Sequence, residues 1–157
     1  MSDTSASLSE RLLREGEKVR TFFRDLSEEQ LECSVYSEGA DWRVREVLAH
    51  FVATEKAFSS LIENVMAGGS GAPEGFDIDT FNQRKVAALK DSSIDELLEN
   101  FQRLRDQTVS IVSTFNEGQL NQTARHPFLG VVPLVDIIKL IYRHNQIHLR
   151  DVRRVII

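Results

Sequence analysis

The sequence predicts an all-α protein of one domain, residues 1–157, folded as a four-helix bundle with a long crossover loop and a short additional helix. Apolar residues recur at helical spacing in four long segments, so each segment can form a helix with one apolar face. Capping patterns precede several of these segments. No segment alternates like a convincing strand, and Val131-Val132 is too short to count as one. Helices of this kind bury their apolar faces against one another, which gives a bundle.

The first long helix should begin at Ser7, which forms a capping-box pattern with Glu10. Gly16 lies within this helix and permits a close approach of a neighbouring element. A second capping box begins at Ser27 and opens one short helical turn. Residues 34–41 follow as a connector.

The second long helix should run from about Val44 to Met66 and end at the glycine pair that follows it. Residues 68–75 form a loop rich in Gly, Ser and Pro, of the kind that often carries function. Asp77 and Asp79 can cap a shorter, weakly amphipathic helix over about residues 80–90.

Ser93 and Glu96 cap the next long helix. Its apolar period runs from Ile94 to Phe115, and Thr108 is the one polar interruption. Residues 118–133 are expected to form a loop that leads into the last helix.

The last helix, Pro133 to Ile156, carries His144 and His148 four residues apart. Side chains at this spacing lie on one face of a helix, with Cβ atoms about 5–6 Å apart. Both imidazoles can therefore reach one metal ion at bonds of about 2.0–2.1 Å. The same spacing runs through Ile141 and Val152, which places both histidines on the apolar stripe. Because buried imidazoles need partners for their nitrogens, the pattern predicts a metal site.

A helix-borne histidine pair needs a third ligand, and the chain has two other histidines, His50 and His126. His50 lies in the middle of the second long helix, beside its apolar stripe. Taken alone it would be a hydrogen-bonded core histidine, but the core-facing pair makes it the predicted third ligand. His126 precedes a proline in a loop and is expected to be solvated. Three imidazoles leave coordination positions open for water or substrate, as a catalytic metal requires.

Several segments resemble those of a known family, the DinB/YfiT-like superfamily. The segment from Trp42 to His50 resembles the start of the family's second helix. The segment His126–Leu134 looks like the family's loop into its last helix, and Tyr142–His148 looks like its closing metal motif. Phe76–Asn82 is similar to a stretch before the third helix in some members. The resemblance covers nearly the whole chain in the right order.

The resemblance implies a four-helix bundle that holds a divalent metal, nickel or zinc above all, on His50, His144 and His148. The family includes bacillithiol S-transferases and the mycothiol-dependent maleylpyruvate isomerase, and many members have no assigned activity. The isomerase type has a glutamate among its ligands, so the all-histidine set of this chain argues against isomerase activity. Dimers are common in the family. The apolar residues 155–157 could serve a homodimer interface, and the sequence leaves the oligomeric state open.

The chemistry of the site limits its function. The run from His144 to His148 lacks the glutamate that serves as general base in His-Glu-x-x-His metalloproteases, so we do not expect protease activity. A metal ion can lower the pKa of bound water to about 7 or deprotonate a coordinated thiol. Because the thiolate is the nucleophile in S-transfer, we expect a metal-dependent thiol S-transferase of small electrophiles, with hydrolysis as the other enzymatic option.

Two further classes of function stay open at this point. One is a non-catalytic metal- or ligand-binding protein that acts in a stress response or sequesters a toxin. The other is a structural bundle whose histidines hydrogen-bond in the core.

Three residues are candidates to support the site. Asp151 could orient a histidine, or it could pair with a surface arginine. Glu55 could act as a base or a ligand near His50, although a solvated position is favoured. Asn82 could contact substrate, and a role in helix capping explains it equally well.

The net charge, the cysteine count and the hydropathy of the chain argue against nucleic-acid partners, a disulfide and a membrane span. A net charge of −5 argues against non-specific binding of nucleic acid. The single cysteine, Cys33, cannot form an intramolecular disulfide and fits a reducing compartment. No apolar run approaches the length of a membrane span, and the first residues lack a signal-peptide core. We therefore expect a cytoplasmic protein with a small-molecule substrate, which can be a low-molecular-weight thiol.

Overall fold

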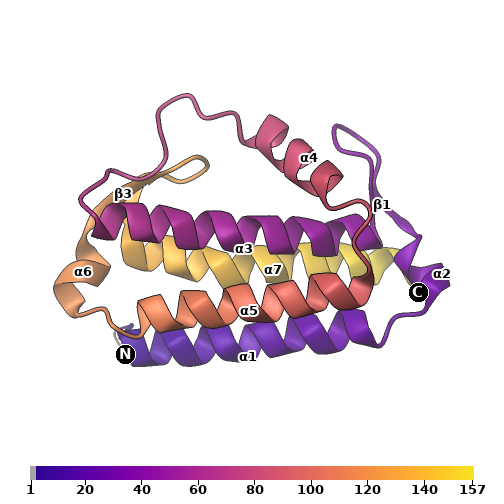
Figure 1. Ribbon diagram of the computed structural model, residues 1–157, viewed down its shortest axis with the longest axis horizontal. Helices are drawn as coiled ribbons and strands as arrows, with labels where there is room; N and C mark the ends of the chain where they lie inside the picture. The colour runs from indigo at the N-terminus through magenta and orange to yellow at the C-terminus, as the bar shows by residue number, and fades with distance from the viewer. Residues whose placement is uncertain (1–2) are drawn as a thin grey trace.

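The computed structural model describes residues 3–157, and most of them are helical (Figure 1), which confirms the predicted helical character of the chain. The long helices are α1 (Ser5–Arg24), α3 (Val44–Met66), α5 (Ile94–Val112) and α7 (Leu134–Val155). They lie side by side along their lengths (Figure 1). Helices α3 and α1 each pack against both α5 and α7. The short helices are α2 (Glu28–Leu31), α4 (Ile78–Ala88) and α6 (Glu117–Asn121).

Hydroxyl groups set the starts of several helices. Helix α1 begins at Ser5 rather than at Ser7, because Thr4 and Ser7 form the capping box. Oγ1 of Thr4 accepts from the backbone N–H of Ser7 at 3.0 Å, and Oγ of Ser7 accepts from that of Thr4 at 2.9 Å. The predicted caps at Ser27 and Ser93 are confirmed, since each hydroxyl accepts a backbone N–H from the first turn of its helix.

Two short antiparallel hairpins join the helices, so the expectation of a chain without strands is wrong. In the predicted connector, β1 (Ser34–Tyr36) pairs with β2 (Trp42–Arg43). In the predicted loop before α7, β3 (Thr123–His126) pairs with β4 (Gly130–Pro133), directly after α6. Strands of two to four residues are too short to establish an alternating pattern, which explains why the sequence did not reveal them.

The loop after α3 is hydrogen-bonded to the second hairpin. The backbone N–H of Arg125 donates to the carbonyl of Ser70, and that of Ala72 donates to the carbonyl of Arg125, both at 2.8 Å. Between these bonds Gly71 has φ +94°, and a Cβ built there would lie 2.5 Å from the carbonyl oxygen of Arg125. Only glycine therefore fits this crossing.

The core consists of two apolar clusters with a buried polar layer between them. Along α5, Phe101 belongs to one cluster and Val112 to the other. Along α7 the same change occurs between Tyr142 and Leu149. The polar layer lies at the change and contains Glu55, Ser59, Arg105, Thr108 and Asn145. Across residues 3–157, no helix is both long and apolar enough to cross a membrane.

Candidate metal centre

Three histidines from two long helices converge on one point. His50 lies on α3, and His144 and His148 lie one turn apart on α7. The Nε2 atoms of His50 and His144 are 2.9 Å apart, and those of His144 and His148 are 3.1 Å apart. One nitrogen of each residue lies within 4.8 Å of the others. The structure therefore brings together the same three histidines that the sequence pattern selected.

The three imidazoles are enclosed by aromatic rings. The buried ring of Phe51 lies 5.9 Å from those of His144 and His148 and 6.5 Å from that of His50, measured between centroids. Trp42 covers His50 at a centroid distance of 4.7 Å. His50 is only 3% exposed, whereas His144 and His148 are half-buried at the edge of the apolar stripe of α7.

This environment keeps the imidazoles neutral. Burial lowers the pKa of His50 to about 3, and the neighbouring His148 acts in the same direction. Burial also holds the pKa of His144 well below its ordinary value. The pKa of His148 is lowered by burial as well, although the carboxylate of Asp151 works against that shift. A neutral imidazole has one free lone pair, which is the form that binds a metal.

A hydrogen-bonded relay fixes the tautomer of His148. The hydroxyl of Tyr36 donates to Oδ2 of Asp151 at 2.5 Å and lies 2.8 Å from Nδ1 of His148. Burial, and then the hydrogen bond to Asp151, raise the pKa of the Tyr36 hydroxyl, so it keeps its proton. Because that proton points to Asp151, the oxygen accepts from Nδ1–H of His148. The lone pair of His148 is therefore on Nε2 and faces the other two histidines.

The donor set fits a divalent metal ion. Two ligand nitrogens at about 2.0–2.1 Å from one ion are roughly 2.9–3.4 Å apart, from right-angle to tetrahedral geometry. The Nε2 separations from His144 to His50 and to His148, 2.9 and 3.1 Å, fall in this range. Nδ1 of His50 and of His144 are buried and have no hydrogen-bond partner among residues 3–157. With Nε2 as the ligand, each of these two nitrogens carries the ring proton.

The three predicted supporting residues have different positions. Asp151 contacts the site through Tyr36, and it also lies 3.7 Å from Arg150 and 3.9 Å from Arg154. Glu55 is 2% exposed, so the favoured expectation of a solvated side chain is wrong: the carboxylate pairs with a buried arginine. Asn82 is half-buried on α4 and has no hydrogen bond to the histidines in the part of the chain that the structure describes. Asp77 rather than Asn82 caps α4.

His126 is not solvated, contrary to expectation. It is 7% exposed on β3, and its ring stacks on Phe58 with centroids 5.7 Å apart. Its Nδ1 accepts the backbone N–H groups of Phe128 and Leu129 at 3.0 and 3.2 Å. The turn after His126 folds back on the imidazole and buries it. Neither the following proline nor the composition of the loop indicated this burial. His126 therefore has a structural role outside the histidine triad.

Two important residues were missed by the sequence analysis. Tyr36 lies in the connector, where no periodic pattern marks it. Arg105 lies within the apolar period of α5 and is 2% exposed. Two signals pointed toward it: the polar interruption at Thr108 and the close approach permitted by Gly16, whose added Cβ would lie 3.1 Å from Cγ of Arg105.

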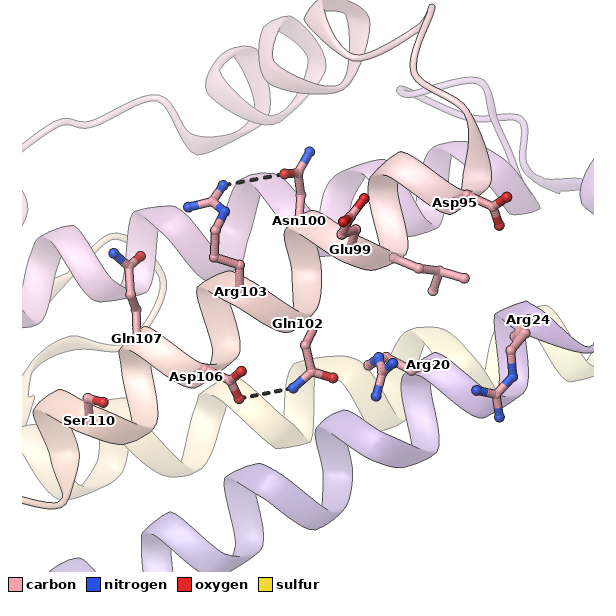
Figure 2. Close-up of a pocket in the computed structure, with 11 residues that line it drawn as sticks. Arg20, Arg24, Asp95, Glu99, Asn100, Gln102, Arg103, Asp106, Gln107 and Ser110 are labelled. Carbon is pink, nitrogen blue, oxygen red and sulfur yellow. Dashed lines mark hydrogen bonds between the residues drawn. The ribbon is translucent and has the colours of Figure 1, made fainter.

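A hollow on the surface lies away from the triad. Its volume is about 880 Å³, and it lies between α1 and α5 (Figure 2). Its lining carries charges of both signs, Arg20, Arg24 and Arg103 together with Asp95, Glu99 and Asp106. This mixture gives no single-sign field that would select a charged ligand.

Comparison with known proteins gives the family and the fold of this chain. A family model described as the DinB superfamily matches residues 11–152. A search of curated proteins found no match. The crystal structure of an uncharacterized protein from Clostridium difficile 630 is similar, with a TM-score of 0.69 and 13% sequence identity. The similarity covers 98% of this chain and 96% of that one, and at this identity it concerns the fold alone.

Proposed function

This chain belongs to the DinB superfamily, and from that membership and the histidine geometry we propose that it is a metal-dependent thiol S-transferase of small electrophiles. The observation that carries the proposal is the convergence of the Nε2 atoms of His50, His144 and His148. We propose nickel or zinc as the cofactor, because imidazole ligands suit both ions.

The histidines and the residues around them would have different roles at such a site. His50, His144 and His148 would hold the ion between α3 and α7. The buried ring of Phe51 lies against all three imidazoles, so a ligand must approach from another side. His144 and His148 are both half-buried, and we propose that a ligand approaches on the side of His148, beside Tyr36. When bound, a divalent ion at such a site lowers the pKa of a coordinated thiol, so that thiolate forms near neutral pH.

The proposed reaction needs only a low-molecular-weight thiol and an electrophile. The thiolate sulfur forms a bond to the electrophilic carbon, and the leaving group departs with the electron pair of the bond that breaks. The thiol proton passes to solvent. Because the triad lies among Trp42, Phe51 and Phe58, the surroundings favour an uncharged, apolar electrophile.

Metal analysis tests the first part of this proposal. The wild-type protein, His144→Ala and His126→Asn are each loaded with zinc or nickel, and bound metal is measured after removal of free ion. We expect one ion per chain in the wild type and in His126→Asn, which alters a histidine outside the triad. His144→Ala should lose most of the bound metal. A well-folded wild type that retains no metal would contradict the proposal.

A conjugation assay tests the second part. The loaded protein is mixed with a chromogenic electrophile and, in turn, with glutathione, bacillithiol or mycothiol. We expect turnover with at least one thiol, its loss on chelation and its return when one metal is added. Metal binding without turnover would assign the chain to the alternative class, a non-catalytic metal- or ligand-binding protein.

A further inference from the structure

One buried guanidinium joins all four long helices. Arg105, on α5, donates from Nε and Nη2 to the two carboxylate oxygens of Glu55 on α3, each at 2.9 Å. Its Nη2 also donates to Oδ1 of Asn145 on α7 at 2.6 Å. Its Nη1 donates to the backbone carbonyl of Leu12 on α1 at 2.8 Å. The planar guanidinium of Arg105 therefore contacts three helices besides its own.

The carboxylate partner is held from a second direction. The hydroxyl of Thr108 donates to Oε2 of Glu55 at 2.9 Å, and Ser59 lies 2.7 Å from that hydroxyl. Arg105 and Glu55 are each only 2% exposed. Burying such a pair costs desolvation energy, and apolar residues of the same volume often hold a protein together equally well. Stability alone therefore does not account for this layer, whereas directional bonds between charged groups define one arrangement of the helices.

The two side chains that Arg105 joins are neighbours of the metal ligands along their helices. Asn145 directly follows His144 on α7. Glu55 lies on α3, less than two turns after His50. We infer that Arg105 is a positioning residue for the metal centre: through Glu55 and Asn145 it sets α3 against α7, and with them the separation of His50 Nε2 and His144 Nε2. This inference rests on the proposed function.

The triad is sensitive to such a shift. Metal–ligand distances tolerate deviations of only about 0.2 Å. His50 and His144 come from different helices, so their 2.9 Å separation depends on how α3 and α7 sit against each other. The separation of His144 and His148 is set within α7 itself. A change in the polar layer should therefore displace His50 from the pair rather than separate the pair.

Asn145→Leu tests the inference, because it removes the bond to α7 and keeps both bonds between Arg105 and Glu55. Ser59→Ala is the matched control, since it removes a buried hydrogen bond of the same layer that does not reach α7 or Arg105. Zinc affinity is measured by competition with a chromophoric chelator, and the visible absorption of bound cobalt reports the coordination geometry. Thermal unfolding is followed for each variant. If Asn145→Leu does not fold, Asn145→Ala replaces it.

We expect Asn145→Leu to weaken zinc binding by about tenfold or more and to alter the cobalt spectrum. Substitutions of residues that support metal ligands without binding the metal have effects of this size. Ser59→Ala should keep the wild-type affinity and spectrum even where its melting temperature falls. Wild-type zinc affinity in the Asn145 variant would overturn the inference, as would equal losses in both variants. If the wild type binds no metal, the proposed function fails, and NMR of the imidazole rings in the metal-free proteins decides. Unchanged His50 signals in Asn145→Leu would then overturn the positioning role, and altered His50 signals would support it.

Discussion

The hydroxyl of Tyr36 lies 2.8 Å from Nδ1 of His148, although 112 residues separate the two in the chain. The contact exists because β1 brings Tyr36 against the C-terminal half of α7, where the Tyr36 and His148 rings meet edge to face at 5.7 Å. Since the Tyr36 hydroxyl donates its hydrogen bond to Asp151, the tyrosine oxygen can only accept from His148. The hairpin that the sequence analysis missed is therefore the element that orients one of the three candidate ligands.

Tyr36→Phe should weaken metal binding by about 10–100-fold while the protein stays folded, because His148 loses the acceptor that fixes its tautomer. Tyr142→Phe is the matched control: this other tyrosine lies on α7 beneath the guanidinium of Arg11, at 4.9 Å from its ring centroid. Zinc competition titrations on both variants make the measurement. Equal affinities for Tyr36→Phe and wild type would show that the relay is dispensable.

The helices and the pair of His144 and His148 could be predicted from the sequence because both depend on local spacing. Helix α3 has the predicted bounds Val44–Met66, and α7 differs from its prediction by one residue at each end. His144 and His148 are brought together by helical geometry alone. His50 needed a further assumption, that its helix packs against α7, which the apolar stripes and the family resemblance supplied. The residues that surround the triad could not be predicted in the same way.

His126 should make stability depend on pH. Burial lowers its pKa in the folded protein, while the unfolded chain titrates near the ordinary value of about 6.5. Below that pH the unfolded state binds a proton that the folded state does not, so the stabilisation from His126 falls as the pH falls. Above it, neutral His126 keeps both bonds from Phe128 and Leu129.

His126→Phe isolates this effect, because it preserves a ring against Phe58 and removes the titrating acceptor. Urea unfolding at pH 8 should give a variant less stable than wild type by about 1–3 kcal/mol, the cost of two backbone N–H groups that lose their partner. The difference should shrink steadily between pH 7 and pH 5. A difference that stays constant over this range would mean that His126 does not titrate as its burial implies.

Gly71→Ala should destabilise the protein more than Gly75→Ala. Both glycines have positive φ, +94° and +70°, so alanine costs about 1–2 kcal/mol at either site. Of these two sites, only at Gly71 would the new Cβ collide with backbone, 2.5 Å from the carbonyl of Arg125, whereas no atom of the described chain lies within 4 Å at Gly75. Chemical denaturation of the two variants measures the difference. Equal losses would indicate that the loop after α3 moves off β3 at little cost.

The polar layer explains why other residues of the site escaped prediction. A charged residue within an apolar stripe is buried only when partners from other helices meet it, and Glu55 and Arg105 supply those partners for each other. Their positions depend on tertiary packing, which helical periodicity does not contain. Gly16 is the exception, since a glycine within a predicted helix signals a close approach before its partner is known.

Gly16→Ala should lower stability although alanine is the better helix former. The exchange gains about 1 kcal/mol of helix propensity. The new Cβ would lie 3.1 Å from Cγ and 3.2 Å from Nη1 of Arg105, the nitrogen that donates to Leu12. Displacing a buried, paired guanidinium costs about 3–5 kcal/mol when a partner is lost entirely, so we expect a net loss of about 1–3 kcal/mol.

Glu10→Ala, an exposed exchange on α1, is the control and should change stability by less than about 0.5 kcal/mol. Because Arg105 cannot retreat without loosening Glu55 or Asn145, the loss should be accompanied by weaker zinc binding in Gly16→Ala alone. A variant that melts at or above the wild-type temperature would mean that Arg105 moves freely, and the polar layer would then be no constraint on the helices around it.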